Sequence, residues 1–536
     1  MPESPEGERT SSHPTSRGLL FTLVAWSVLS IGTLGAMQQN VAAPGMYYDE
    51  ALFAGLAKDF VTGQKRLHMP GCERITIFNR ELPVFVQPYI GGLKSWMFVP
   101  SFSVFGATLA VARLTTAFWA MLSVLFFMLG IRLWFGTGPA IIGGALLTLD
   151  PTCFFLGILD WGAAVPALLC RCLAFYLASV WSRNRSVVCL LLAAFFLGLG
   201  VFNKIDLAVF IAATGIAGLI FYARHIRHAI RTRWWAAALA LLMFFLPIGL
   251  TLPRMSKVLA VEEQTPSLTS ELGEKFHTFL ALYDGSYFYR LMDVGGLFDK
   301  MYDQPAPIYV PLLPILIIVF FAVAVFVRNK HRLQVIGFLI TALVLTTVGV
   351  FLLPGAIRIH HAVLAFPFPQ LIIVSVFSFL WNDQTRRGVR TIAATALVIL
   401  FATQVHAIAT TEKLVNQTGG RGRWSNALDQ FCREYKDRSD VVIASLDWGF
   451  NEQLAFLTDT PRLVEPFWAF PAYQGNTPPL PAQPNYLYLA HSPEYSLFRY
   501  DVPYLQEAQA GAEGVETQPY SDREGHVVFY TIRFRY

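Results

Sequence analysis

The chain has 536 residues, of which 54% are hydrophobic and 14% are charged, and it carries a net charge of +5. Soluble domains average about 25% charged residues, so this composition excludes a soluble globular protein. It also excludes a nucleic-acid-binding protein, because the Lys and Arg residues fall in short clusters between apolar runs instead of forming a basic surface. The sequence therefore predicts a polytopic α-helical membrane protein.

The amino-terminal residues 1–18 are polar and rich in Ser and Pro, which is typical of a disordered tail. The uncharged run Leu19–Met37 that follows is about long enough to cross a bilayer, and we expect it to be an uncleaved first span. Ten further apolar runs make eleven expected transmembrane helices in all. These eleven spans are 19–37, 108–131, 138–157, 161–181, 186–202, 205–223, 234–253, 308–327, 333–353, 362–381 and 391–409.

The basic residues between these spans predict the orientation of the chain. They occupy every second loop, at Arg132, Arg183/Arg185, Arg224–Arg233, Arg328–Arg332 and Arg386–Arg390. Loops rich in Lys and Arg stay in the cytoplasm, so the amino terminus is expected inside the cell. Three long segments, 38–107, 254–307 and 410–536, are then expected outside an inner (plasma) membrane.

The first outer segment has two stretches that are typical of helices lying along a membrane surface. Apolar residues recur at helical spacing after Glu50, from Ala51 to Val61. The second stretch, Tyr89–Phe105, combines Trp96 with several Phe, as interfacial segments do. We expect two interfacial helices here.

The last part of the chain, residues 411–536, is predicted to be a small extracytoplasmic α/β domain behind the membrane module 19–410. We expect a helix at Ser425–Tyr435, strands at Asp440–Ser445, Asn485–Ala490 and His526–Phe534, and a Pro-rich loop at Pro471–Pro484. The six cysteines show no metal-binding spacing. Cys72 and Cys432 are expected on the same side of the membrane, which leaves a disulfide between them open.

Two adjacent carboxylates, Asp49 and Glu50, lie just past the first span at the expected boundary of lipid and water. One of them can be explained as a cap of the helix that follows. A cap does not account for both, and an enzyme acting on a membrane-embedded substrate needs a base at this depth. Asp160 opens the fourth span at the same outer face, where a capping role is again the alternative to a catalytic one.

Several cations are expected at the same face. They are Lys94 in the second interfacial stretch, Lys204 in a tight turn, and Arg358, His360 and His361 in a late turn. Each one alone can be explained by snorkelling to lipid headgroups. Together they favour a function, because cations that converge on carboxylates suit a substrate that carries a phosphate.

Two further arginines are predicted to have structural partners. Arg171 lies in the middle of a span, where an unpaired charge costs several kcal/mol. We expect it, and Arg113 at the start of the second span, to pair with a buried acid or with backbone carbonyls.

The string YYDEALFAGLAKDF resembles the first outer-loop motif of the GT-C glycosyltransferases. The nearest branch comprises the protein O-mannosyltransferases and the aminoarabinose transferase of lipid A. The strings PYIGGLKSWMFVPSFSVFGATLAVARL, LDPTCFFLGILDWGAAVPALL, GLGVFNKIDLAVF and IRIHHAVLAFPFPQLII are similar to later blocks of the family. The usual Lys-Pro-Pro-Leu string of the first block is absent, and so is the Trp-Trp-Asp pattern of oligosaccharyltransferases.

This resemblance implies an enzyme that moves a sugar from a polyprenyl phosphate to a hydroxyl of a protein, lipid or glycan. Asp49 would be the general base of an inverting displacement, with Glu50 as its helper and Asp160 as the family's second acid. The donor phosphate would bind Lys94, Lys204, Arg358, His360 and His361, or a divalent ion held by Asp49 and Asp160. No other cofactor is implied. The alternatives are a transporter or lipid flippase, which would show inverted repeats, and a scaffold whose outer tail binds a partner.

Overall fold

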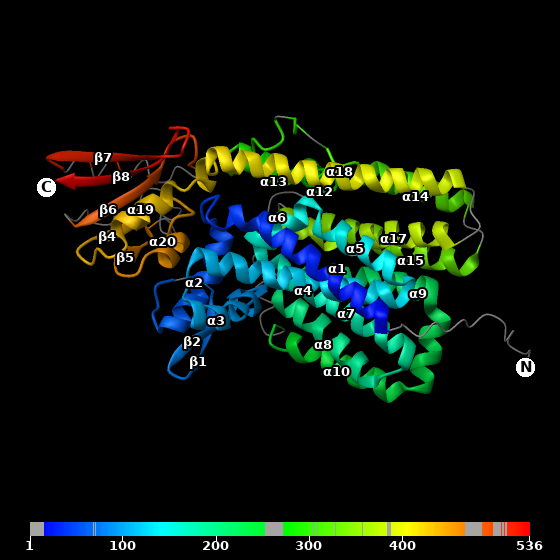
Figure 1. Ribbon diagram of the computed structural model, residues 1–536. Coiled ribbons are helices and arrows are strands. Elements are labelled where there is room, and N and C mark those ends of the chain that lie inside the picture. Colours follow the sequence, from blue (N-terminus) through cyan, green and yellow to red (C-terminus); the bar gives the residue numbers. More distant parts are fainter. Residues whose placement is uncertain are drawn as a thin grey trace, which may run out of the picture.

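The computed structural model of the protein describes residues 16–251 apart from 68 and 70, 272–326 apart from 304 and 308, 329–382 apart from 356, 387–466, 485–496, 505, 509 and 512–535. Long helices form a bundle, and a small sheet domain lies at one end of it (Figure 1). The helix α1 (Ser16–Met37) begins at the opposite end of the bundle. The expected membrane module and terminal α/β domain are therefore both present.

Each of the eleven expected spans coincides with a helix or with consecutive helices. After α1 these are α4 (Leu109–Phe135), α5 (Thr137–Thr148) with α6 (Pro151–Leu159), α7 (Ala164–Asn184), α8 (Val187–Asn203), α9 (Leu207–Thr232), α10 (Trp234–Ile248), α14 (Leu312–Phe326), α15 (Lys330–Phe351), α16 (Ile359–Ala362) with α17 (Phe368–Asn382), and α18 (Arg387–Thr418). Within the described residues, seven spans are long and apolar enough to cross a bilayer, or eight if the bent pair of α5 and α6 is one span. The helices α8 and α10 are apolar but shorter, with 17 and 15 residues. The chain is a multi-pass membrane protein.

The third expected span is broken in the middle. The helices α5 and α6 meet at an angle of 66°. The first helix ends at Thr148, and Asp150 caps the next, because its Oδ1 accepts a hydrogen bond from the backbone N–H of Cys153 at 3.1 Å. Pro151 follows at the first helical position, where the missing N–H costs nothing. The bend brings Asp160, at the end of α6, toward the first outer segment.

The first outer segment contains the two expected helices and an unexpected sheet. The helices are α2 (Tyr48–Thr62) and α3 (Leu93–Phe105). Between them, β1 (Glu73–Ile77), β2 (Arg80–Gln87) and the short β3 (Ile90–Gly91) form an antiparallel sheet. The helix α2 does not lie open on a membrane surface, since every residue from Glu50 to Asp59 is buried. Its apolar side chains pack against α3, β2 and the terminal domain.

The terminal domain follows the long helix α18, which runs from the bundle to the domain (Figure 1). Its helices are η5 (Gly422–Trp424), α19 (Ala427–Tyr435) and α20 (Asn451–Leu457). Its sheet has the strand order β5 (Arg462–Val464), β4 (Val442–Ser445), β6 (Tyr486–His491), β8 (Val527–Arg535) and β7 (Gly514–Ser521). The strands β5, β4 and β6 are parallel, whereas β8 is antiparallel to β6 and β7. The predicted helix and three strands are present, and the predicted loop Pro471–Pro484 lies outside the described residues.

The terminal domain is anchored on the first outer segment through the carboxyl end of α20. Lys58 of α2 donates to the carbonyls of Phe456 and Thr458 at 2.6 and 3.0 Å and pairs with Asp459 at 2.8 Å. Arg66 donates to the carbonyl of Asp459 at 2.6 Å. A cation at the carboxyl end of a helix is favoured by the helix dipole. The position of α2 therefore depends on the terminal domain as well as on the bundle.

Further features of the fold are two more helices, the buried Arg171 and the cysteines. The helix α12 (Leu272–Asp284) contacts α13 (Tyr287–Asp293), α14 and α16, and α13 contacts α6 and α18. Arg171, in the middle of α7, donates to the carbonyl of Leu364 at 3.1 Å, which is one of the two kinds of partner that we expected. All six cysteines are free, so the structure forms no disulfide between Cys72 and Cys432.

Candidate active site

The two carboxylates at the start of α2 have different surroundings. Glu50 is buried and accepts hydrogen bonds from Arg113 Nε at 2.8 Å and Arg113 Nη2 at 2.9 Å. Its Oε2 also accepts from the backbone N–H of Tyr47 at 3.1 Å, which caps the helix. Glu50 is thus the capping residue of the pair, and Arg113 has the buried acid that its sequence position predicted.

Asp49 precedes Glu50 and is partly exposed. Burial raises the pKa of its carboxyl from 3.8 to about 6. The nearby cations Lys94 and Lys204 oppose this increase of the pKa, Asp160 adds to it, and a hydrogen bond from the backbone of Gly162 also opposes it. Three of the charged residues that the sequence predicted for the site therefore lie close enough to Asp49 to act on it.

Asp160 and Lys94 form an ion pair beneath this site. Lys94 Nζ lies 3.3 Å from Asp160 Oδ2 and also donates to the backbone carbonyl of Asp160. Asp160 Oδ1 accepts from the backbone N–H of Val165 at 2.9 Å, at the start of α7. The ammonium of Lys94 lies 4.4 Å from the ring centre of Phe53 in α2, a cation–π distance. Burial nevertheless raises the pKa of Asp160.

Lys204 lies in the turn between α8 and α9, where it pairs with Asp206 at 3.1 Å. Burial lowers the pKa of Lys204. The short strand β3 holds this turn, because Ile90 and Lys204 form a β-bridge and Ile205 N–H donates to the Tyr89 carbonyl at 3.2 Å. The antiparallel sheet β1–β3, which the sequence analysis did not predict, therefore connects the segment of Lys94 to the turn of Lys204.

Gly91 makes this junction possible. A Cβ at Gly91 would lie 2.4 Å from the carbonyl oxygen of Phe202, and real Cβ atoms do not approach a backbone oxygen so closely. The absence of a side chain here lets β3 contact the end of α8.

We expect Gly91→Ala to separate β3 from the α8–α9 turn. Transfer activity should fall strongly, because Lys94 and Lys204 lose their fixed relation and a misplacement of about 1 Å can cost on the order of 10²-fold in rate. The measurement is activity together with thermal unfolding of the purified protein. Gly138→Ala is the matched control, since a Cβ at Gly138 meets no atom within 4 Å. Wild-type activity of Gly91→Ala would show that the junction does not position the site.

The late turn contributes Arg358, His360 and His361. Arg358 pairs with Glu274 and stacks on Phe298, with its Cζ 3.9 Å from the ring centre. The Nδ1 of His361 accepts from the backbone N–H of Arg358 at 3.2 Å, so its Nε2 carries the proton when the ring is neutral. That Nε2 lies 3.9 Å from Asp206 Oδ2, which links this turn to Lys204 and Asp206.

His360 occupies a different place from His361. Its ring lies against Gly162 in the α6–α7 turn, and a Cβ on Gly162 would lie 2.5 Å from His360 Cγ. The Nδ1 of His360 has no hydrogen-bond partner among the described residues. The structure thus places His360 at the turn that holds Asp160, whereas His361 approaches Asp206.

A divalent ion between Asp49 and Asp160 does not fit this arrangement. Both oxygens of Asp160 are engaged, one by Val165 N–H and the other by the ammonium of Lys94. Lys94 therefore occupies the position beside Asp160 that a cation would take. We derive no step through a metal ion at these residues.

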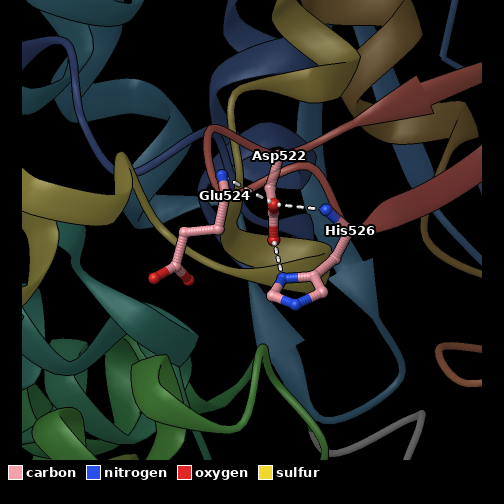
Figure 2. A group of neighbouring side chains, drawn as sticks. All are labelled: Asp522, Glu524 and His526. Atoms are coloured by element: carbon pink, nitrogen blue, oxygen red, sulfur yellow. Dashed lines mark hydrogen bonds and ion pairs between the residues drawn. The ribbon is translucent and has the colours of Figure 1, made fainter.

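A group with metal-like spacing lies far from Asp49 in the sequence, in the β7–β8 turn of the terminal domain, and consists of Asp522, Glu524 and His526 (Figure 2). Asp522 Oδ1 accepts from the backbone N–H groups of Glu524 and His526, both at 3.0 Å, which shapes the turn. The carboxylate of Glu524 points away from the imidazole in Figure 2 and binds Arg421, with Nε to Oε2 at 2.6 Å. A guanidinium beside Glu524 opposes a second cation, so these contacts indicate a structural turn.

Sequence analysis also missed a cluster of Asp447, His491 and Arg423 in the terminal domain. His491 Nδ1 lies 2.9 Å from Asp447 Oδ2, and Arg423 Nη2 lies 3.5 Å from the same oxygen. These residues line or adjoin a small pocket whose other wall includes Tyr47 and Tyr48. No motif connects them in the sequence, and the fold of the terminal domain brings Arg423 and His491 to the same pocket as Tyr47 and Tyr48.

Comparisons with known proteins agree with this architecture. The sequence model of a family described as dolichyl-phosphate-mannose-protein mannosyltransferase matches residues 93–249. The crystal structure of apo ArnT from Cupriavidus metallidurans is similar, with a TM-score of 0.56, 11% identity, and coverage of 95% of this chain and 98% of that one. The structure of the same protein bound to undecaprenyl phosphate gives a TM-score of 0.55 and 14% identity, covering 97% of this chain and 98% of that one. No curated protein matches the sequence.

These findings confirm the predicted resemblance to the GT-C glycosyltransferases, and the fold is that of ArnT over nearly the whole of both chains. The family match spans the blocks that contain Lys94, Asp160 and Lys204. The Asp49 motif lies outside the matched residues. The roles of individual residues rest on the geometry described above.

Proposed function

We propose that this membrane protein with the GT-C fold is a glycosyltransferase. It takes a sugar from a polyprenyl phosphate donor and transfers it to a hydroxyl of an acceptor at the outer face of the membrane. Support comes from the fold, which it shares with a protein solved with bound undecaprenyl phosphate, and from the family match. The single observation that carries the proposal is the position of Asp49, a partly exposed carboxylate with Lys94, Lys204 and Asp160 around it.

Asp49 is the general base in this proposal. A base works best when its pKa is near the working pH, because it is then ionised and still accepts a proton readily. The pKa of about 6 meets this condition at neutral pH. Asp49 takes the proton of the acceptor hydroxyl while the oxygen forms a bond to the anomeric carbon and the bond to the donor phosphate breaks. Glu50 and Arg113 hold the first turn of α2 and do not touch the reacting atoms.

The cations have two roles. Lys204, Arg358 and His361 stabilise the charge that gathers on the departing phosphate. Lys94 holds Asp160, and through it the start of α7, which limits its direct part in phosphate binding. His360 supports the turn around Gly162, whose backbone binds Asp49. Asp160 holds these residues in place relative to one another, and its charge raises the pKa of Asp49.

The transporter alternative is less well supported, because the charged residues of the site form one cluster. Asp49, Asp160 and Lys204 come from three separate segments and lie close enough for their charges to interact. A transporter would need polar groups along a path between both faces. The deep cation Arg171 is bound by a backbone carbonyl and lies over the ring of Phe210.

The test is the pH dependence of sugar transfer by the full-length protein in nanodiscs loaded with a radiolabelled polyprenyl phosphate sugar. Protonation removes the base, so we expect the rate to fall as the pH drops through about 6. An unshifted carboxyl with its ordinary pKa of 3.8 would keep the rate constant down to about pH 5. A flat profile between pH 5 and 7 would contradict the assignment of Asp49. Failure of every donor to react in the wild-type protein would contradict the proposed function.

A further inference from the structure

The terminal domain and the start of α2 enclose a small pocket that none of the roles above uses. Its wall combines residues from the first outer segment, from η5 and from the loops around α20, among them Tyr47, Tyr48, Arg423, Trp448, Gln453 and His491. Two of these lining residues, Tyr47 and Tyr48, immediately precede Asp49 in the chain. The charges of Asp49 and Arg423 also both act on the phenol of Tyr47.

Two buried polar side chains in this wall each have an atom that makes no hydrogen bond to any residue that the structure describes. The side chain of Arg423 is 5% exposed, and its Nη2 makes no hydrogen bond within the described part of the chain, its nearest acid oxygen being at 3.5 Å. Gln453 is 4% exposed, and its Oε1 likewise has no partner among the described residues. Buried polar atoms are rarely left without partners in native proteins, so a donor and an acceptor in two side chains that line one pocket indicate that a small polar group binds there.

The chemistry of the two atoms restricts the ligand. A phosphate or carboxylate would satisfy the Arg423 donor but would repel the Gln453 oxygen. An ammonium would do the opposite. A hydroxyl can both donate and accept a hydrogen bond, so its chemistry is compatible with both atoms.

The remaining wall is suited to a sugar. The rings of Tyr48 and Trp448 lie against each other, with centres 4.5 Å apart. The imidazole of His491 stacks on Phe450 at 4.0 Å, and its Nδ1 faces Asp447. Aromatic rings that carry a polar tip offer a hydrophobic face beside hydrogen-bonding groups, as the edge of a pyranose requires.

We propose that this pocket is an acceptor subsite that binds the hydroxyl-bearing edge of a sugar unit through Arg423, Gln453 and Trp448. The acceptor is then a glycan or a glycolipid, and not a serine or threonine of a protein. The inference rests on the proposed function, and it assigns to the terminal domain the selection of the acceptor. Only one edge of the ring enters the pocket, which leaves another hydroxyl of the acceptor free to reach Asp49.

The experiment measures binding without catalysis. The full-length protein in nanodiscs is mixed with methyl glycosides of glucose, galactose, mannose and N-acetylglucosamine, and binding is followed by saturation-transfer NMR. At least one glycoside should bind the wild-type protein. Gln453→Leu should weaken that binding by roughly three- to tenfold, the effect of one hydrogen bond. Gln453→Glu keeps an acceptor oxygen and should retain most of the affinity.

The controls separate this proposal from a loss of folding and from the proposed function. Gln430→Leu in α19, an exposed position of the same domain, should bind as the wild-type protein does. Asp49→Asn should also bind the glycoside normally, because it removes the base and not the subsite. Equal binding by Gln453→Leu, no binding of any of the four glycosides, or binding of a serine-containing peptide that Gln453→Leu abolishes would overturn the proposal. Glycoside binding by the wild-type protein without sugar transfer from any donor would instead contradict the proposed function.

Discussion

Asp49→Asn should lower the rate of sugar transfer by about 10²–10⁴-fold, the usual contribution of a general base. This corresponds to about 3–5 kcal/mol of activation free energy. The asparagine keeps the size of the side chain but cannot take a proton. Because burial disfavours the charged form of Asp49, as its raised pKa shows, removal of the charge should not impair folding. The measurement is the transfer rate with saturating donor, together with the thermal midpoint of the variant.

Two further variants serve as controls for this result. Asp299→Asn replaces an exposed aspartate of another outer segment and should keep full activity. Asp49→Glu keeps a base that is displaced by one methylene group, so it should retain part of the rate. Donor binding should be unchanged in Asp49→Asn, since the phosphate is held by other residues in our proposal. Normal transfer by Asp49→Asn would remove this residue from the mechanism.

The membrane helices could be predicted from sequence because a bilayer imposes a simple rule of length and polarity. The eleven apolar runs all proved to be helices. The break between α5 and α6 could not be predicted in the same way, since hydropathy averages over a window. The Asp150-Pro151 pair carried the signal, as a cap followed by a residue that begins helices well.

The hairpin of the first outer segment was missed because its strands give a weak pattern. The strand β1 has the sequence ERITI and is half exposed, while β2 contains a proline. This sheet positions the site through a contact between two residues that are distant in the sequence, Ile90 and Lys204. The Gly91-Gly92 pair was visible, but a glycine pair does not reveal which backbone will approach it.

The residues of the site were predictable by type and by the expected face of the membrane, whereas their partners were not. Asp49, Asp160 and Lys204, which the sequence predicted for one site, lie close enough for their charges to interact. Glu50 is the structural residue and Asp49 the proposed base because Arg113, which lies 63 residues further along the chain, binds Glu50. The cluster around Arg423 depends on strands β4 and β6 becoming neighbours, and nothing in the local sequence specifies that pairing.

Arg113→Met should be the most destabilising of these substitutions, because Arg113 is 1% exposed and uses its whole guanidinium. Besides Glu50, it donates to the carbonyls of Asn40, Pro44 and Gly45 at 2.8, 2.9 and 3.2 Å. Removal of one partner of a buried ion pair typically costs about 3–5 kcal/mol, since the other charge stays buried without compensation. The thermal midpoint of the purified protein should fall accordingly. Arg113→Lys should not restore it, because an ammonium cannot bind a carboxylate and three carbonyls at once.

The double variant Arg113→Met/Glu50→Gln decides how much of this loss comes from the stranded carboxylate. If the uncompensated charge of Glu50 dominates, the double variant should be more stable than Arg113→Met alone. The carbonyls of residues 40–45 remain without their donor in both, so stability should return only in part. Activity should stay low, because the first turn of α2 is no longer held and Asp49 moves with it. A double variant as unstable as the sum of the two single variants would mean that Arg113 acts through the carbonyls alone, and that Glu50 does not position Asp49.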